Sequence, residues 1–196
     1  MNKTKKLLID ITFDLLYKKG YCATSMSDIL DIAKLTKGAM YYHFSTKDVL
    51  ILATMEHYLE PILTSGWIEP LKQSEKPLET ITKQIDEFYA MYADKSSFLS
   101  IKHGCPLNNF IIDMSDKNEE FFTYLKSVYK RWEDSVTEAL QYAQDLNQTK
   151  TKFDAKSKSL FIISSIEGSI GTAKAYNDLD ALRKSFDVLN SYILEL

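Results

Sequence analysis

Apolar residues recur every three or four positions along most of this chain, which is the spacing of a buried helix face. The first such segment covers residues 3–19 and is stopped by Gly20. Its apolar stripe consists of Leu8, Ile9, Ile11, Phe13, Leu15 and Leu16. The same spacing continues over residues 25–34 and 36–44, so the pattern predicts three helices in the first 44 residues.

The second and third predicted helices are separated by only two or three residues. Thr24 with Ser25 can cap one of them and Thr36 the other, because a hydroxyl accepts hydrogen bonds from the free amides of a first turn. Two short helices joined by so tight a turn form a helix-turn-helix candidate.

Helical spacing also dominates the rest of the chain. A fourth helix is expected over residues 47–59, with Pro61 ending or kinking it. Further helices are expected over residues 77–93, 106–114, 118–140, 154–176 and 178–194. With only 6 glycines and 4 prolines, the chain predicts an all-α fold. We expect a three-helix DNA-binding domain, residues 1–46, on a larger helical ligand-binding and dimerisation domain, residues 47–196.

Charge is distributed unevenly between these two parts. The net charge of −3 argues by itself against a nucleic-acid binder. Residues 1–50, however, hold eight Lys and five Asp with no Arg or Glu, which gives +3 and leaves −6 for residues 51–196. A basic head on an acidic body restores the nucleic-acid interpretation.

The third predicted helix has the residue types that major-groove reading requires. The groove is about 12 Å wide, so a reading helix needs small residues where it approaches the bases. Gly38 and Ala39 supply them, Lys37 adds positive charge, and Thr36 with the first helical amides can hold a phosphate.

Polar side chains flank this segment on both sides. Tyr42 and His43 extend polar tips towards the DNA backbone, and Ser25 and Lys47 are placed to clamp flanking phosphates. A lone histidine is more often a surface or capping residue, and its position after Tyr42 favours the DNA role. Phe44 is expected in the core because of its spacing from Met40.

Over its first 50 residues the chain resembles the TetR (tetracycline-repressor-like) family of bacterial regulators. The residues that carry the resemblance are Gly20-Tyr21, Thr24-Ser25-Met26, Asp28-Ile29, Lys37-Gly38, Tyr41-Tyr42-His43-Phe44, Lys47-Asp48 and Leu50. Their spacing holds throughout, which makes the match specific. The resemblance implies major-groove contacts by Lys37, Gly38, Ala39 and Tyr42, and phosphate contacts by Ser25, Tyr41, His43 and Lys47. Thr24 and Thr36 complete the predicted DNA-binding set.

Two positions depart from the family pattern. The family usually has glycine in the turn where this chain has Lys34, and often a small residue where Leu30 stands. A left-handed Lys34 costs on the order of 1 kcal/mol, and Leu30 pushes the two helices apart. The docking geometry on DNA is therefore expected to be this chain's own.

The body is rich in aromatic residues, most of which are expected in the core. A subset lining a pocket between helices would suit an apolar or planar ligand. The predicted ligand-binding set is Trp67, Phe88, Tyr92, Phe110, Tyr129 and Trp132. No cofactor is expected.

Small residues mark one face of the helix expected over residues 154–176. Ser164, Ser165, Gly168 and Gly171 would let another helix approach closely, so this face is a candidate dimer interface. Close packing within one subunit is the alternative. The resemblance implies the first, as a four-helix bundle made from the last two helices of each subunit.

The expected function is a cytoplasmic, ligand-responsive repressor that binds a palindromic DNA operator as a homodimer and is released by a small apolar or aromatic effector. The alternative is a ligand-independent DNA-organising or division factor on the same scaffold. An enzyme ranks last, because His103 with Cys105 is the only semblance of a nucleophile and base. No metal site is expected from His57 or the two cysteines, and no segment is apolar enough for a membrane.

Overall fold

The computed structural model describes residues 1–72 and 74–196. Within these ranges the regular structure is helical, apart from an isolated bridge between Ser100 and Gly104, which confirms the all-α prediction. No helix of the described residues has the length and apolar character needed to cross a membrane.

The helices group into two compact units that do not follow chain order. The first unit comprises Met1–Pro61 and Pro106–Lys126, and the second comprises Ile62–Cys105 and Ser127–Leu196. The chain thus passes between the units three times. The predicted split between residues 46 and 47 is a different partition, because the first unit also contains a segment from the middle of the chain.

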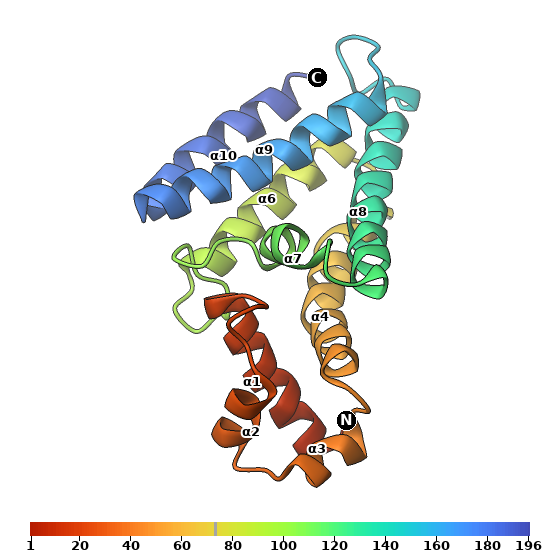
Figure 1. Cartoon of the computed structure of the whole chain (residues 1–196). Helices are drawn as coiled ribbons and strands as arrows, with labels where there is room; N and C mark the ends of the chain where they lie inside the picture. The colour runs from red at the N-terminus through yellow and green to blue at the C-terminus, as the bar shows by residue number, and fades with distance from the viewer. Residues whose placement is uncertain (73) are drawn as a thin grey trace. The chain divides into compact units, whose positions relative to one another are not determined.

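The first unit contains the three helices expected for the DNA-binding head and three further helical segments. They are α1 (Lys3–Lys19), α2 (Met26–Ala33), α3 (Lys37–His43), α4 (Lys47–Leu63) as far as Pro61, α7 (Pro106–Met114) and the beginning of α8 (Glu119–Asp145) (Figure 1). Its buried cluster is drawn from the first four: Leu8, Ile9, Leu15, Ile29, Leu30, Ala33, Met40, Phe44 and Leu50. Phe44 is buried here, as its spacing predicts.

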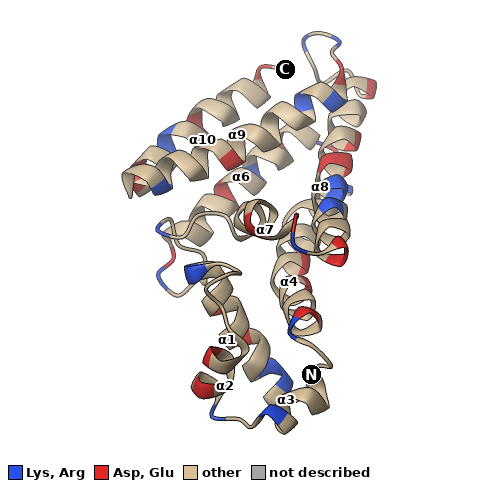
Figure 2. Cartoon of the chain, in the orientation of Figure 1, with Lys and Arg blue, Asp and Glu red and all other residues tan. Residues whose placement is uncertain are grey.

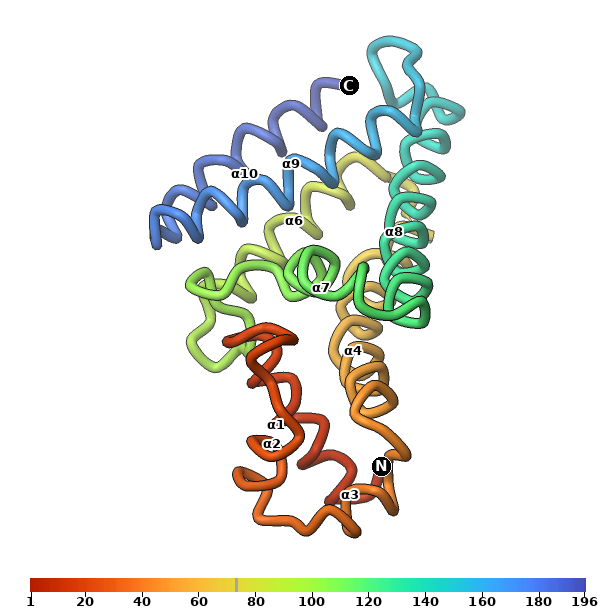
Figure 3. The backbone as a smooth tube through the Cα atoms, in the orientation of Figure 1, coloured from red at the N-terminus to blue at the C-terminus, as the bar shows by residue number. Residues whose placement is uncertain are grey.

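The second unit is a helical layer built around α10 (Leu179–Leu194). This helix packs against both α6 (Pro77–Ala93) and α9 (Ala155–Tyr176), and the three backbones run side by side in Figure 3. The unit also contains η1 (Thr64–Ile68), α5 (Glu69–Lys72) and the rest of α8. The apolar stripe of α6 is buried: Leu78, Ile81, Ile85, Phe88 and Tyr92.

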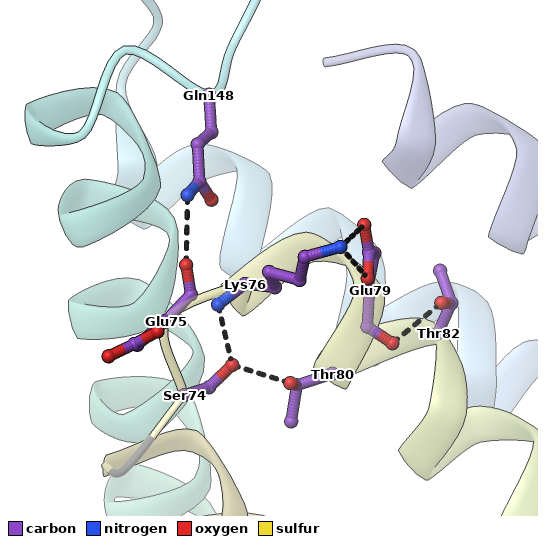
Figure 4. A network of polar contacts seen from close by, with 7 residues as sticks. All are labelled: Ser74, Glu75, Lys76, Glu79, Thr80, Thr82 and Gln148. Atoms are coloured by element: carbon purple, nitrogen blue, oxygen red, sulfur yellow. Dashed lines mark hydrogen bonds and ion pairs between the residues drawn. The ribbon is translucent and has the colours of Figure 1, made fainter.

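The start of α6 shows how local chemistry sets a helix boundary. Pro77 occupies the first turn, where its missing N–H is not needed. The Lys76 amide donates to Ser74 Oγ at 3.0 Å, and this hydroxyl lies 2.6 Å from Thr80 Oγ1 (Figure 4). Gln148 Nε2 donates to the Glu75 carbonyl at 2.8 Å and so ties this turn to the segment after α8.

Pro61 does not end the fourth helix, so of the two expected outcomes, an end or a kink, the first is excluded. It lies inside α4, which continues to Leu63, and a π-helical turn over Thr64–Ile68 follows directly. Proline removes one backbone donor but does not forbid the next turn, and a wider π turn accommodates a disturbed hydrogen-bond ladder.

Candidate nucleic-acid interface

The first helix of the predicted motif begins with a reciprocal cap. The Asp28 amide donates to Ser25 Oγ at 3.0 Å, and the Ser25 amide donates to Asp28 Oδ2 at 3.2 Å. Hydrogen bonds to the Asp28 carboxyl from the side chain and the backbone amide of Ser25 lower its pKa. Such a capping box satisfies two amides that the helix cannot, so α2 starts at a fixed residue.

Lys34 makes the turn between α2 and α3. It adopts the left-handed conformation, with φ 54° and ψ 42°, and its amide donates to the Leu30 carbonyl. The Leu35 amide donates to the same carbonyl at 3.1 Å. The turn that the family usually makes with glycine is therefore made here by a lysine, which leaves a positive side chain exposed at the turn.

Thr36 caps the second helix of the motif, as predicted. The Ala39 amide donates to Thr36 Oγ1 at 3.2 Å. Met40, one turn into α3, is fully buried, and the next residue on that side, Phe44, is buried as well. The apolar side of α3 is thus fully used inside the protein.

The opposite side of α3 carries two exposed tyrosines. Tyr42 is 84% exposed and Tyr41 is 54% exposed. His43 is half-buried, and its ring meets the Tyr42 ring edge-on with centroids 5.0 Å apart. Two adjacent tyrosines exposed on one short helix make this face a candidate contact surface.

Gly38 is not explained by packing inside the chain. A Cβ atom placed there would meet only Thr36 Oγ1, at 3.9 Å, among the described residues. Gly38 is also exposed. The protein itself leaves room for a side chain at this position, so a small residue favours close approach by a partner.

Lysines surround the same face. Figure 2 shows basic positions at the α2–α3 turn and at the start of α3. Lys34 and Lys37 form no ion pair with any described residue. The Lys47 ammonium lies 4.4 Å from the centre of the Tyr21 ring, which positions it at the start of α4.

Thr24 differs from the other predicted DNA-binding residues. It is buried, and its hydroxyl donates to the Gly20 carbonyl at 2.7 Å. This placement favours a structural role in the turn between α1 and α2.

Asp113 is a positioning residue that the sequence interpretation missed. It lies on α7, 92 positions from Tyr21, and its Oδ2 accepts the Tyr21 amide hydrogen. A Cβ atom at Gly20, which has φ 80°, would lie 2.9 Å from the same oxygen. The glycine therefore serves both the positive φ and the close approach of the carboxylate.

The predicted ligand-binding aromatics separate into three groups. In the second unit, Trp132 lies 5.0 Å from Trp67 and 6.0 Å from Tyr129, measured between ring centres. Phe88 and Tyr92 form a second pair on α6, where Tyr92 Oη donates to the Gly104 carbonyl at 3.2 Å. The third group is in the first unit, where Phe110 meets the Phe13 ring edge-on at 6.2 Å.

Glu167 is a second residue that the sequence interpretation missed. It is buried in the middle of α9, and the Cys105 thiol donates to its Oε1 at 3.2 Å. The sequence does carry a signal for this residue, because Glu167 is a single carboxylate among the apolar residues Ile163, Ile166 and Ile170. His103, which the sequence pairs with Cys105, donates its backbone amide to Ser100, and the described residues contain no cluster of metal-binding side chains.

The predicted dimer residues lie on an open face of α9. Ser164, Gly168 and Gly171 are exposed, and Ser165 is half-buried. A Cβ atom at Gly168 or Gly171 would meet no atom within 4 Å, its own helix backbone apart, among the described residues. Close packing within one subunit therefore does not account for the two glycines.

The capped helices, the tight turn and the exposed basic face define a helix-turn-helix module of the kind that DNA-binding regulators carry. Two family models match the chain. Residues 8–54 match bacterial regulatory proteins of the tetR family, and residues 77–189 match the tetracyclin repressor-like C-terminal domain. The chain belongs to the TetR family of transcriptional regulators, which confirms the resemblance and the prediction that it is not an enzyme.

Individual relatives agree with this assignment. The chain is 31% identical over 194 residues to an HTH-type transcriptional regulator in the lacX 3′ region of Lactococcus lactis subsp. lactis, covering 97% of this chain and 93% of that protein. It is 28% identical to the HTH-type transcriptional regulator QacR of Staphylococcus aureus, covering 94% and 80%.

Solved structures share the fold. A TetR transcriptional regulator from Chloroflexus aurantiacus superposes with a TM-score of 0.84 at 25% identity, over 97% of this chain and 94% of that one. A SmeT–triclosan complex superposes with a TM-score of 0.77 at 19% identity, over 98% and 90%.

Proposed function

We propose that this regulator is a ligand-responsive repressor that binds a palindromic operator as a homodimer. Lys37, Gly38, Ala39 and Tyr42 read base edges in the major groove. The phosphates are held by Ser25, Thr36, Tyr41, His43 and Lys47. Two observations on α3 support this proposal most directly. Tyr42 is 84% exposed, and the packing of the described residues leaves room for a side chain at Gly38, so the glycine is not needed for packing.

The dimer rests on the open face of α9. Exposed apolar residues accompany its small residues on α9 and α10, namely Leu160, Phe161 and Val188. Together they offer an apolar surface that a second copy can cover. Two copies would then place their α3 helices in successive major grooves, about 34 to 36 Å apart.

Effector binding would act through the covalent connections between the two units. One is α4, which carries Lys47 at its start and enters the second unit after Pro61. Another is α7, which follows Cys105 directly and holds the Tyr21 amide through Asp113. A ligand that favours one spacing of the heads lowers operator affinity by its differential binding energy. The complex of SmeT with triclosan supports a small-molecule effector for this fold.

Operator binding tests the proposal directly. Duplexes selected from a randomised pool by the full chain are measured by fluorescence anisotropy at fixed salt. Tyr42→Ala and Lys37→Ala are expected to lower affinity at least tenfold, and Lys47→Ala to reduce the slope of log affinity against log salt by about one. Tyr142→Ala, which changes an exposed tyrosine of α8, is the matched control.

Gly168→Leu tests the dimer in the same assay. The added side chain has room within the subunit, so the variant folds, but it blocks helix approach and is expected to sediment as a monomer. Gly66→Leu, at a glycine with equal room, is the control. Sequence-specific binding retained by Tyr42→Ala and Lys37→Ala would overturn the DNA contacts, and an intact Gly168→Leu dimer would overturn the interface.

A further inference from the structure

The Glu167 carboxylate in the second unit is only partly satisfied. The residue is 7% exposed, and its Oε1 accepts the Cys105 thiol hydrogen at 3.2 Å. Its Oε2 is buried with no hydrogen-bond partner among the described residues. No described lysine or arginine pairs with it. The part of the chain that the structure describes therefore buries an acceptor without supplying a donor for it.

Burial makes the charge of this group depend on its surroundings. The cost of desolvating an ionised carboxylate raises the pKa of Glu167 to about 7, and the Cys105 hydrogen bond offsets only part of the shift. The other titratable group that interacts with it is Tyr129 on α8. Burial, with the charge of Glu167, raises the pKa of Tyr129 to about 12, so this hydroxyl stays neutral and adds no second negative charge.

A second unpartnered polar atom lies in the aromatic cluster of Tyr129, Trp132 and Trp67. The Trp132 indole N–H is buried and has no acceptor among the described residues. Tyr129 links the two features, because the charge of Glu167 helps to raise its pKa while its ring meets that of Trp132 edge-on, with ring centres 6.0 Å apart. Trp67 adds a further ring, 5.0 Å from that of Trp132. Aromatic faces attract cations most strongly where water is excluded.

We propose that Glu167, Tyr129, Trp132 and Trp67 bind an aromatic amine in its protonated form. The ammonium N–H donates to Glu167, and the Trp132 indole N–H donates to an acceptor atom of the same ligand. A hydrogen-bonding ammonium is preferred to a quaternary one, since Oε2 lacks a donor and not only a counter-charge. This inference names the effector class of the regulator proposed above and so rests on that function.

Binding in this way is linked to proton release. The ammonium binds the ionised form of Glu167, so any proton that Glu167 held in the free protein passes to solvent. Amine affinity therefore rises about tenfold per pH unit below pH 7 and levels off above it. A neutral ligand would bind the protonated form and give the opposite dependence.

Titration calorimetry of the full chain tests the proposal with three matched probes. They are (6-methoxynaphthalen-2-yl)methylamine, its N-trimethyl analogue and the corresponding alcohol. At pH 7.5 the amine is expected to bind at least tenfold more tightly than either analogue. At pH 6.5, titrations in two buffers of different ionisation enthalpy are expected to reveal net proton release. Equal affinity for amine and alcohol, or net proton uptake, would overturn the inference.

Two variants locate the carboxylate responsible. Glu167→Gln is expected to lower amine affinity at least tenfold and to abolish proton release, with alcohol binding unchanged. Glu138→Gln makes the same charge change in an open pocket of about 220 Å³ lined also by Lys72, Ser135 and Tyr142, and is expected to bind as wild type. If Glu138→Gln and not Glu167→Gln weakens binding, the ligand lies in that pocket and the inference fails.

Operator binding by the same preparations separates the inference from the proposed function. Sequence-specific DNA binding with no affinity for the amine leaves the DNA-binding regulator standing and overturns the amine site. Glu167-dependent amine binding that leaves operator affinity unchanged supports the site and overturns ligand-responsive release.

Discussion

The α2–α3 segment and the centre of α9 satisfy their polar groups in opposite ways. In α2–α3 the caps at Ser25 and Thr36 each bond an amide three residues away. In α9, Glu167 meets Cys105, its one hydrogen-bond donor among the described residues, across 62 positions and keeps its other oxygen unpartnered there. The polar caps of the first segment are satisfied by hydrogen bonds within the segment, whereas the second segment keeps an acceptor that a bound ligand can satisfy.

The largest expected effect that tests this difference is the change in the free energy of unfolding caused by Glu167→Gln, measured as a function of pH. The pKa of Glu167 is raised in the folded state. Below its unfolded-state pKa of about 4.3 the group is protonated in both states, so it does not reduce the free energy of unfolding there. The destabilisation of the folded state by Glu167 grows as the pH rises towards 7 and is constant above pH 7. Glu167→Gln is expected to raise the free energy of unfolding by about 2 kcal/mol at pH 8, after allowance for a buried amide, and to leave it nearly unchanged at pH 5.

Urea denaturation at fixed protein concentration measures this effect. Glu138→Gln, an exposed carboxylate of the same unit, is expected to show no such pH-dependent gain. If Glu167→Gln destabilises the chain equally at both pH values, Glu167 is a satisfied structural residue and the contrast is wrong.

Asp113→Ala sharpens the comparison from the side of the first unit, where one long-range polar contact also exists. It removes the acceptor of the Tyr21 amide and is expected to cost about 1.5 kcal/mol in the free energy of unfolding. Asp116→Ala, at an exposed carboxylate two residues beyond α7, is the control. Equal effects of the two variants would show that Asp113 does not hold the turn.

The smallest expected effect is at the turn itself. Lys34 has φ 54°, so Lys34→Gly relieves left-handed strain and is expected to stabilise the chain by about 1 kcal/mol or less, which chemical denaturation can resolve. Asn177→Gly, at φ 49°, is the matched variant and should gain less, because asparagine tolerates this conformation. A loss of stability at Lys34→Gly would contradict the assignment of strain.

The same contrast explains what the sequence could predict. Helix starts at Ser25, Thr36, Pro77 and Asp154 follow from caps and first-turn residues within three positions, and the structure confirms them. The exposed face of α3, which we propose binds DNA, was predictable for the same reason.

Long-range pairings were beyond the sequence. Asp113 with Tyr21 and Glu167 with Cys105 join residues 92 and 62 positions apart, and no periodicity indicates which carboxylate meets which donor. The sequence left open whether Pro61 ends or kinks its helix, because the outcome at a helical proline depends on whether the next turn can widen, as η1 does.

The discontinuous first unit limits how this regulator can be recombined. Its α1 packs through Phe13 against Tyr58, with ring centres 3.6 Å apart, and edge-on against Phe110 of α7. A chimera that joined residues 1–46 to another body would discard both rings together with Asp113. The first unit therefore consists of two separate pieces of chain, and a functional chimera would have to exchange both pieces together.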